Sequence, residues 1–195
     1  MSITVEHLSK GVSLVTLSAE TSRNGLDMKS MKSMSDIMDD LLEDSSIKSI
    51  IMTGSGKFFC SGADIDSFAS AIENGSIADL VGGLTSLLHP MQLKIRASEK
   101  IFIAAINGSA AGGGLGLALC ADYRVCIPEA KLAAAFFSLG LSPDGGTTWL
   151  LPRLVGTQKA KKFFFNNEVW NGNLSLIHIS EPTRPLYISY AVFCL

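Results

Sequence analysis

The chain has 195 residues, a formal net charge of −2, and a composition of 47% hydrophobic and 17% charged residues. This composition supplies ample material for a core of about one domain and argues against disorder, and the charge gives no support for nucleic-acid binding. The four cysteines form no Cys-x-x-Cys pair and no apolar run is long enough to cross a membrane, so we expect a reduced, cytoplasmic protein without a membrane partner.

The N-terminal third of the chain predicts a hairpin, a helix and a strand. Residues 3–6 and 12–17 flank Lys10 and Gly11 as a β-hairpin would. Apolar residues then recur at helical spacing over residues 28–42 after a candidate N-cap, Asp27, and their methionine stripe is expected to pack in the core. Residues 47–52 predict a buried strand, and residues 65–74 a mobile helix or loop.

The remaining elements alternate between strands and helices. Residues 78–97 predict one long helix that Pro90 kinks, and residues 102–106 and 123–127 predict strands on either side of a glycine-rich helix. This order predicts parallel pairing with right-handed crossovers. Residues 131–137 predict a short strand, 139–146 a turn, and 147–154 and 158–165 two short helices, the first disrupted by Pro152 beyond its opening turn.

The run INGSAAGGGLG at residues 106–116 is the stretch around which the chain is organised. A strand, a glycine turn and a helix start place unpaired N–H groups around one point, where negative charge is favoured. The phosphate-loop pattern needs Lys and Ser or Thr after the last glycine, and Leu115 stands there. A reaction oxyanion is therefore the better candidate. A tight strand-to-helix crossing without chemistry is the alternative for this run alone.

A second strand-then-glycine unit ends in FCSGADI at residues 59–65, so each unit can supply one N–H group to a shared oxygen. Four runs occur in order: RNGLD at 23–27, FCSGADI at 59–65, AAINGSAAGGG at 104–114 and LGLSPDG at 139–145. Together they closely resemble the crotonase (enoyl-CoA hydratase/isomerase) superfamily, over about residues 3–172. The resemblance implies an α/β fold, a spiral of ββα units with parallel sheets, forming one crotonase-like domain at residues 1–173.

The resemblance also implies an acyl-CoA substrate, no cofactor besides the coenzyme A of that substrate, and a trimer-based homo-oligomer for an intact family member. By motif position, the amides of Ala63 and Gly113 hold the thioester oxygen and stabilise the enolate charge that grows on it. The neighbouring positions expected to contact substrate are Gly62, Asp64, Ile65, Gly112 and Gly114. For Asp64, helix capping is an equal alternative.

Family hydratases hold and activate water with two glutamates, and the matching positions here carry Gly116 and Phe136. The chain thus departs from the hydratase pattern, and Phe136 is counted with the substrate-binding positions. Asp144 stands where family isomerases and 4-chlorobenzoyl-CoA dehalogenases carry their functional acid. A lone carboxylate in an apolar pocket suits a proton shuttle, because burial raises its pKa. Capping the helix that begins near Thr147 is the alternative role for Asp144.

His89 aligns with the histidine that dehalogenases use to activate water, but Phe136 replaces the tryptophan of those enzymes. A structural hydrogen bond near Pro90 is the alternative role, and no cluster has metal-ligand spacing. Residues 139–155 especially resemble the isomerases of phenylacetate-type ring degradation and fatty-acid oxidation. We therefore expect a double-bond shift in an enoyl-CoA. The alternatives are hydrolysis or dehalogenation of a CoA thioester through His89, and a non-catalytic acyl-CoA-binding protein.

Residues 174–195 break the family pattern. Family members continue with a helical C-terminal region, whereas LSLIHISEPTR and ISYAVFCL here resemble translations of sequencing-adapter DNA. We therefore expect residues 174–195 to be a non-native tail, with the C-terminal helical region missing.

Overall fold

The computed structural model describes residues 2–19, 23–173 and 181–182. The predicted non-native tail at residues 174–195 lies outside the described residues, apart from residues 181–182. No helix in the described part of the chain is both long enough and apolar enough to cross a bilayer.

The N-terminal hairpin and the first helix are confirmed. Strands β1 (Ser2–Ser9) and β2 (Val12–Ser18) pair antiparallel, and α1 (Met28–Glu43) follows. Asp27 accepts a hydrogen bond from the Ser30 amide, and the Ser30 side chain accepts one from the Asp27 amide, which completes a capping box. The methionine stripe packs in the core, because Met31, Met34 and Met38 are almost fully buried.

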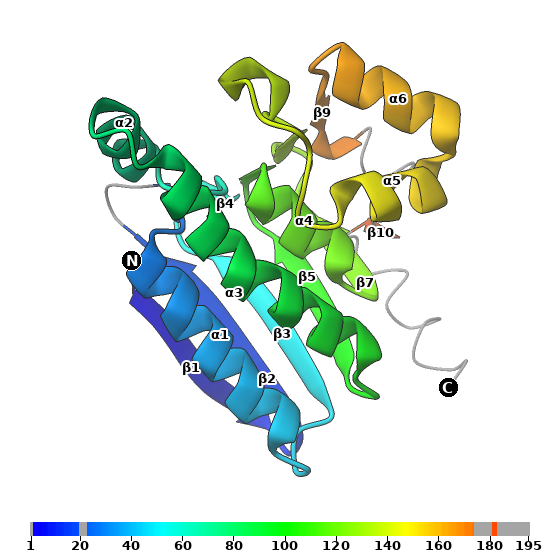
Figure 1. Cartoon of the computed structure of the whole chain (residues 1–195). Helices are drawn as coiled ribbons and strands as arrows, with labels where there is room; N and C mark the ends of the chain where they lie inside the picture. The colour runs from blue at the N-terminus through cyan, green and yellow to red at the C-terminus, as the bar shows by residue number, and fades with distance from the viewer. Residues whose placement is uncertain (1, 20–22, 174–180, 183–195) are drawn as a thin grey trace.

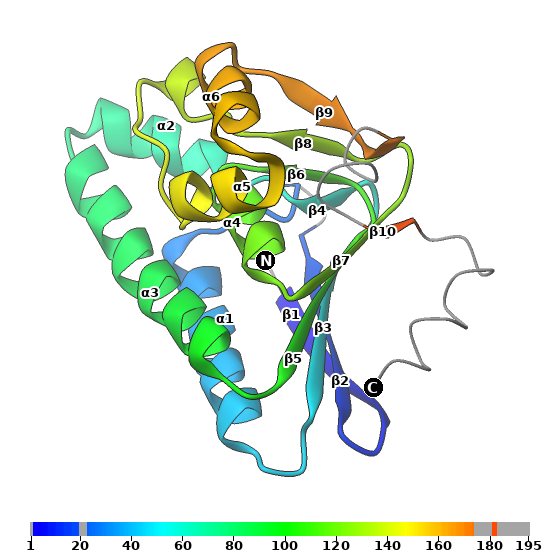
Figure 2. The same cartoon turned by 90° about the vertical axis from the view of Figure 1, so that its right-hand side faces the viewer.

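Two sheets form the framework (Figure 2). The larger has the order β1-β2-β3-β5-β7-β10, and every pair from β2 onward is parallel. Its later strands are β3 (Ser49–Gly54), β5 (Ile101–Ile106), β7 (Tyr123–Cys126) and β10 (Glu181–Pro182). The smaller has the order β4-β6-β8-β9, in which β9 is antiparallel, and consists of β4 (Phe58–Cys60), β6 (Ser109–Ala111), β8 (Lys131–Ala133) and β9 (Val169–Asn171).

The chain winds through these sheets as the expected ββα spiral. Each turn adds one strand to the large sheet, one to the small sheet and then helix: β3-β4, β5-β6 and β7-β8 are successive turns. The helices are α2 (Ile65–Glu73), α3 (Ile77–Ala97), α4 (Gly113–Cys120), α5 (Thr147–Val155) and α6 (Thr157–Phe165), with a 3-10 turn η1 at Phe137–Leu139. Helices α1 and α3 lie side by side over one face of the large sheet (Figure 1).

Two expectations about local structure are wrong. The strand expected at residues 131–137 ends at Ala133, because Ala135 takes a positive φ of 61° and the chain then turns into η1. Pro152 does not disrupt α5 beyond its first turn. Because proline has no N–H group, Pro152 removes a single intrahelical hydrogen bond. The helix continues past it: the Gly156 amide donates to the Pro152 carbonyl oxygen at 2.9 Å, and the fully buried Leu151 packs the helix against the core.

Candidate active site

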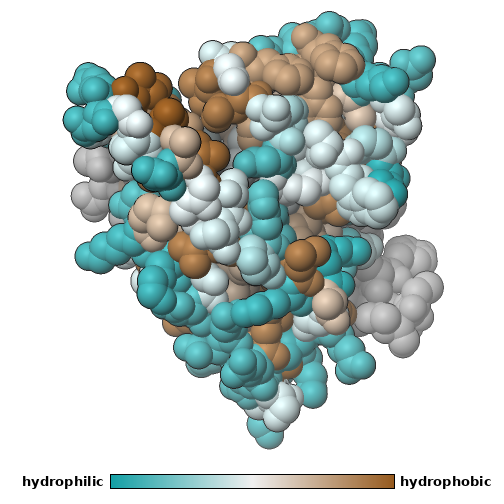
Figure 3. Space-filling model, viewed as in Figure 1, coloured by the Kyte–Doolittle hydropathy of each residue, from teal (hydrophilic) through white to brown (hydrophobic). Residues whose placement is uncertain are grey.

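A cavity of about 390 Å³ gathers residues from distant parts of the chain. Leu88 of α3 and Phe68 of α2 supply part of its apolar wall. The predicted site residues that line it are Ala63, Ile65, Gly112, Gly113, Phe136 and Asp144. Exposed apolar residues of α2 and η1 lie around this part of the molecule, and Figure 3 shows hydrophobic surface gathered over both elements. The cavity therefore suits a largely apolar ligand.

The amides of Ala63 and Gly113 are the two that the sequence assigns to an oxyanion site. A parallel bridge to Leu26 uses the Gly62 carbonyl and the Asp64 amide, so the Ala63 amide between them faces the other edge. Gly113 is the first residue of α4, where an amide has no intrahelical partner. Within the described part of the chain, neither amide donates a hydrogen bond to a protein acceptor.

Glycines bring these two segments together. Gly62 has φ of +88°, and a Cβ atom there would lie 2.8 Å from the Ala111 carbonyl oxygen and 3.1 Å from the Gly113 nitrogen. A Cβ atom on Gly114 would lie 2.2 Å from the Cys60 carbonyl oxygen. Side chains at these positions would push the two segments apart, so Gly62 and Gly114 shape the site without lining the cavity.

Asn24 holds the start of β4 and the turn before it in place, a role that the sequence did not suggest beyond the motif it belongs to. Its side chain is buried, accepts a hydrogen bond from the Ala19 amide, and donates to the carbonyl oxygens of Ser55, Phe58 and Phe59. These bonds attach the segment that leads to Ala63 to the segment around residue 24.

Asp144 lies in the loop between η1 and α5 and is half-buried. Burial raises the pKa of its carboxyl group, and the nearby His89 partly opposes this rise. The N-cap of α5 is Gly146, without a side-chain cap bond, and Thr147 bonds to the main-chain oxygen of Asp144. The alternative role of Asp144 as a side-chain cap therefore finds no support, and Asp144 lines the cavity.

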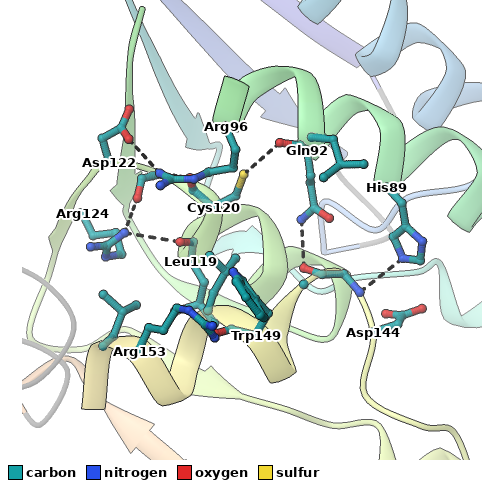
Figure 4. Close-up of a pocket in the computed structure, with 16 residues that line it drawn as sticks. His89, Gln92, Arg96, Leu119, Cys120, Asp122, Arg124, Asp144, Trp149 and Arg153 are labelled. Atoms are coloured by element: carbon teal, nitrogen blue, oxygen red, sulfur yellow. Dashed lines mark hydrogen bonds and ion pairs between the residues drawn. The ribbon is translucent and has the colours of Figure 1, made fainter. Parts of the chain in front are cut away.

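His89 lies outside this cavity. It lines a second cavity of about 800 Å³, whose wall Asp144 shares, and its Nε2 atom accepts a hydrogen bond from the Gly145 amide at 3.4 Å (Figure 4). His89 therefore has a hydrogen bond with the main chain, which is the structural role considered above.

Of the two remaining predicted substrate-binding positions, Asp64 has a structural role and Ile65 lines the cavity. Asp64 caps α2 by accepting from the Ser67 amide at 2.9 Å and does not line the cavity, whereas Ile65 lines it and is 58% exposed. The neighbouring thiol of Cys60 is no candidate nucleophile, because burial raises its pKa to about 12. The described residues hold no group of three or more His, Cys, Asp or Glu side chains placed to bind a metal ion.

Sequence comparisons place the chain in one protein family. Residues 7–173 match the family described as enoyl-CoA hydratase/isomerase. The 1,2-epoxyphenylacetyl-CoA isomerase of Escherichia coli (strain K12) is 32% identical over 160 residues, 82% of this chain and 61% of that protein. Enoyl-CoA hydratase ACTT3 of Alternaria alternata is 30% identical over 178 residues, 90% of this chain and 58% of that protein. The chain thus spans about three-fifths of the length of these curated relatives.

Solved structures agree with this result. The enoyl-CoA hydratase of Bacillus anthracis matches with a TM-score of 0.86 at 27% identity, over 98% of this chain and 74% of that one. PA4980 of Pseudomonas aeruginosa matches with a TM-score of 0.83 at 30% identity, over 97% of this chain and 80% of that one.

Proposed function

The chain belongs to the enoyl-CoA hydratase/isomerase family of the crotonase superfamily, and from that premise we propose that it shifts a double bond in an enoyl-CoA. The observation that carries the proposal is the shared cavity: the half-buried Asp144 lines it together with Ala63 and Gly113, whose amides donate no hydrogen bond within the described part of the chain. The substrate supplies the coenzyme A, and the reaction needs no further cofactor.

In this mechanism the thioester oxygen accepts hydrogen bonds from both amides. The Asp144 carboxylate removes a proton from carbon 2 of a 3-enoyl-CoA, and the electron pair moves onto the thioester oxygen as an enolate. The two amides stabilise that charge. Asp144 then returns the proton to carbon 4, which leaves a 2-enoyl-CoA and restores the carboxylate. A raised pKa suits both steps, because one group must take the proton and release it.

Water addition is less well supported. Family hydratases carry their first glutamate at the position of Gly116, and here a Cβ atom would lie 2.4 Å from the Gly145 carbonyl oxygen. The second glutamate position carries Phe136, whose side chain is buried. The names of the relatives do not decide between the two reactions, because the E. coli relative is named as an isomerase and ACTT3 as a hydratase.

The runner-up hypotheses have weaker support. Dehalogenation or hydrolysis through His89 requires the imidazole to reach the substrate, and His89 does not line the cavity of Ala63 and Gly113. A non-catalytic acyl-CoA-binding protein would not need a half-buried carboxylate beside two unpaired amides. For the whole protein, we propose an acyl-CoA substrate and a trimer-based homo-oligomer, as the family resemblance implies.

The test is a product analysis with 3-enoyl-CoA and 2-enoyl-CoA substrates. We expect positional isomers, and Asp144→Asn should reduce turnover on the order of 10²- to 10⁴-fold while CoA-ester binding persists. Asp36→Asn, an exposed aspartate that pairs with Lys32 on α1, is the matched control and should leave turnover unchanged. A product that gains water without any positional isomer would refute the proposal, and an unaffected Asp144→Asn variant would favour a binding protein.

A further inference from the structure

Gly145, the residue that follows Asp144, is held through both of its main-chain polar groups by side chains on one face of α3. The Gln92 side chain donates from Nε2 to the Gly145 carbonyl oxygen at 3.1 Å, and the Gly145 amide donates to His89 Nε2 at 3.4 Å. Residues three apart on a helix lie on the same face, so both side chains reach the same residue. Figure 4 shows the two bonds converging on the residue next to Asp144.

We propose that His89 and Gln92 are positioning residues, a clamp that sets where the Asp144 carboxylate stands relative to the substrate. This inference rests on the proposed function, since it assigns the clamp a role in the proton transfer by Asp144. Neither side chain is proposed to touch the substrate: neither lines the cavity that holds Ala63 and Gly113.

The Gln92 side of the clamp is buried and hydrogen-bonded. Gln92 is 7% exposed, and its main-chain carbonyl oxygen accepts a hydrogen bond from the Cys120 thiol at 3.6 Å. A buried side-chain amide that lost its partner would leave polar groups unsatisfied, so the Gln92–Gly145 bond strongly favours one position of the loop.

The clamp also seats the loop against the helix that carries the Gly113 amide. A Cβ atom on Gly145 would lie 3.8 Å from the Cα atoms of both Gly113 and Gly116. The Asp144 loop and the first turn of α4 are therefore in contact, and a shift of Gly145 changes the separation between the base and the oxyanion site. A displacement of about 1 Å in a catalytic group is enough to cost on the order of 100-fold in rate.

The two bonds make different demands on a replacement side chain. Gln92 must donate at this length, and Gln92→Met keeps the size while removing the donor. His89 must accept, so His89→Gln can restore an acceptor oxygen, whereas His89→Leu cannot. His89 is half-buried, which makes its pair of variants the safer test if Gln92→Met fails to fold.

The experiment measures kcat and KM for 3-enoyl-CoA isomerisation by the full chain and its variants, together with thermal melting. We expect Gln92→Met and His89→Leu to lower kcat on the order of 10- to 100-fold, with KM within about threefold. His89→Gln should keep a kcat at least about fivefold above that of His89→Leu, because the acceptor is restored. Gln158→Met, an exposed glutamine on α6, is the matched control and should match the parent.

Asp144→Asn, measured in the same assay as the clamp variants, distinguishes a failure of the clamp from a failure of the proposed function. If Asp144→Asn is inactive while Gln92→Met and His89→Leu keep the parental kcat, the clamp is wrong and the proposed function stands. If His89→Gln is no better than His89→Leu, the acceptor role is wrong. If Asp144→Asn keeps full turnover, the proposed function itself fails, whatever the clamp variants do.

Discussion

Gly62 lies directly against the amide of Gly113, and a methyl group added to Gly62 would lie 3.1 Å from that nitrogen. The two residues are 51 positions apart, since 113 − 62 = 51. One precedes the candidate amide of Ala63 and the other carries the second candidate amide. Their contact therefore determines how closely the two halves of the candidate oxyanion site approach each other.

Gly62→Ala should lower both stability and turnover. Alanine at φ of +88° is strained, and its methyl group would also lie 2.8 Å from the Ala111 carbonyl oxygen. We expect a loss of about 1–3 kcal/mol in the free energy of unfolding beyond that of Gly75→Ala, measured in urea. Gly75 is the matched control, because it has φ of +68° and no atom within 4 Å of an added Cβ. Equal losses in the two variants would contradict the contact.

Because the pKa of Asp144 is raised, we expect turnover and folding stability to change in opposite directions as the pH rises. As the pH rises through that pKa, the base forms and turnover should increase. Stability changes in the other direction: a carboxyl group whose pKa is raised by folding contributes stability below its ordinary pKa of 3.8 and loses it above the raised value.

Asp144→Asn should therefore become more stable than the parent as the pH rises from below 3.8 through the raised pKa. Urea unfolding of both proteins at a series of pH values measures this difference. A difference in stability that stays constant across the series would show that Asp144 is not destabilised by ionisation in the fold.

Gly116→Glu should not create a hydratase. Its Cβ atom would lie 2.4 Å from the Gly145 carbonyl oxygen and 3.2 Å from Gln92 Nε2, so the side chain displaces the loop that carries Asp144. We expect loss of isomerisation and no hydration product, measured with 2-enoyl-CoA. Gly82→Glu on α3, where an added Cβ meets nothing within 4 Å, is the control that should keep the parental activity.

Asn24→Asp should destabilise the protein although it changes one atom. The aspartate keeps the acceptor for Ala19 but loses the donor to three carbonyl oxygens, including that of Phe58 at 2.7 Å. We expect a loss of about 1–3 kcal/mol in the free energy of unfolding. Asn74→Asp, an exposed position, should cost much less in the same urea titration. Similar costs at both positions would mean that the Asn24 bonds add little to stability.

Some of these features follow from the sequence by itself. Helical spacing, an N-cap at Asp27 and the alternation of strands and helices depend on neighbouring residues, and they were enough to predict the hairpin, α1, α3 and the parallel sheet. The spiral fold was predicted from the family that the four ordered glycine-containing runs resemble. The same runs placed Ala63, Gly113 and Asp144 among the candidate site residues, and all three line one cavity.

Other features were decided only by the tertiary structure. Strands of three residues, such as β4 and β6, are too short for a period to be read from them. The bonds that His89 and Gln92 make to Gly145 join residues more than 50 positions apart. Asn24 likewise donates to three carbonyl oxygens more than 30 positions away, two of them in β4. Such contacts depend on how elements pack, because each polar group finds its partner only when the layers have come together.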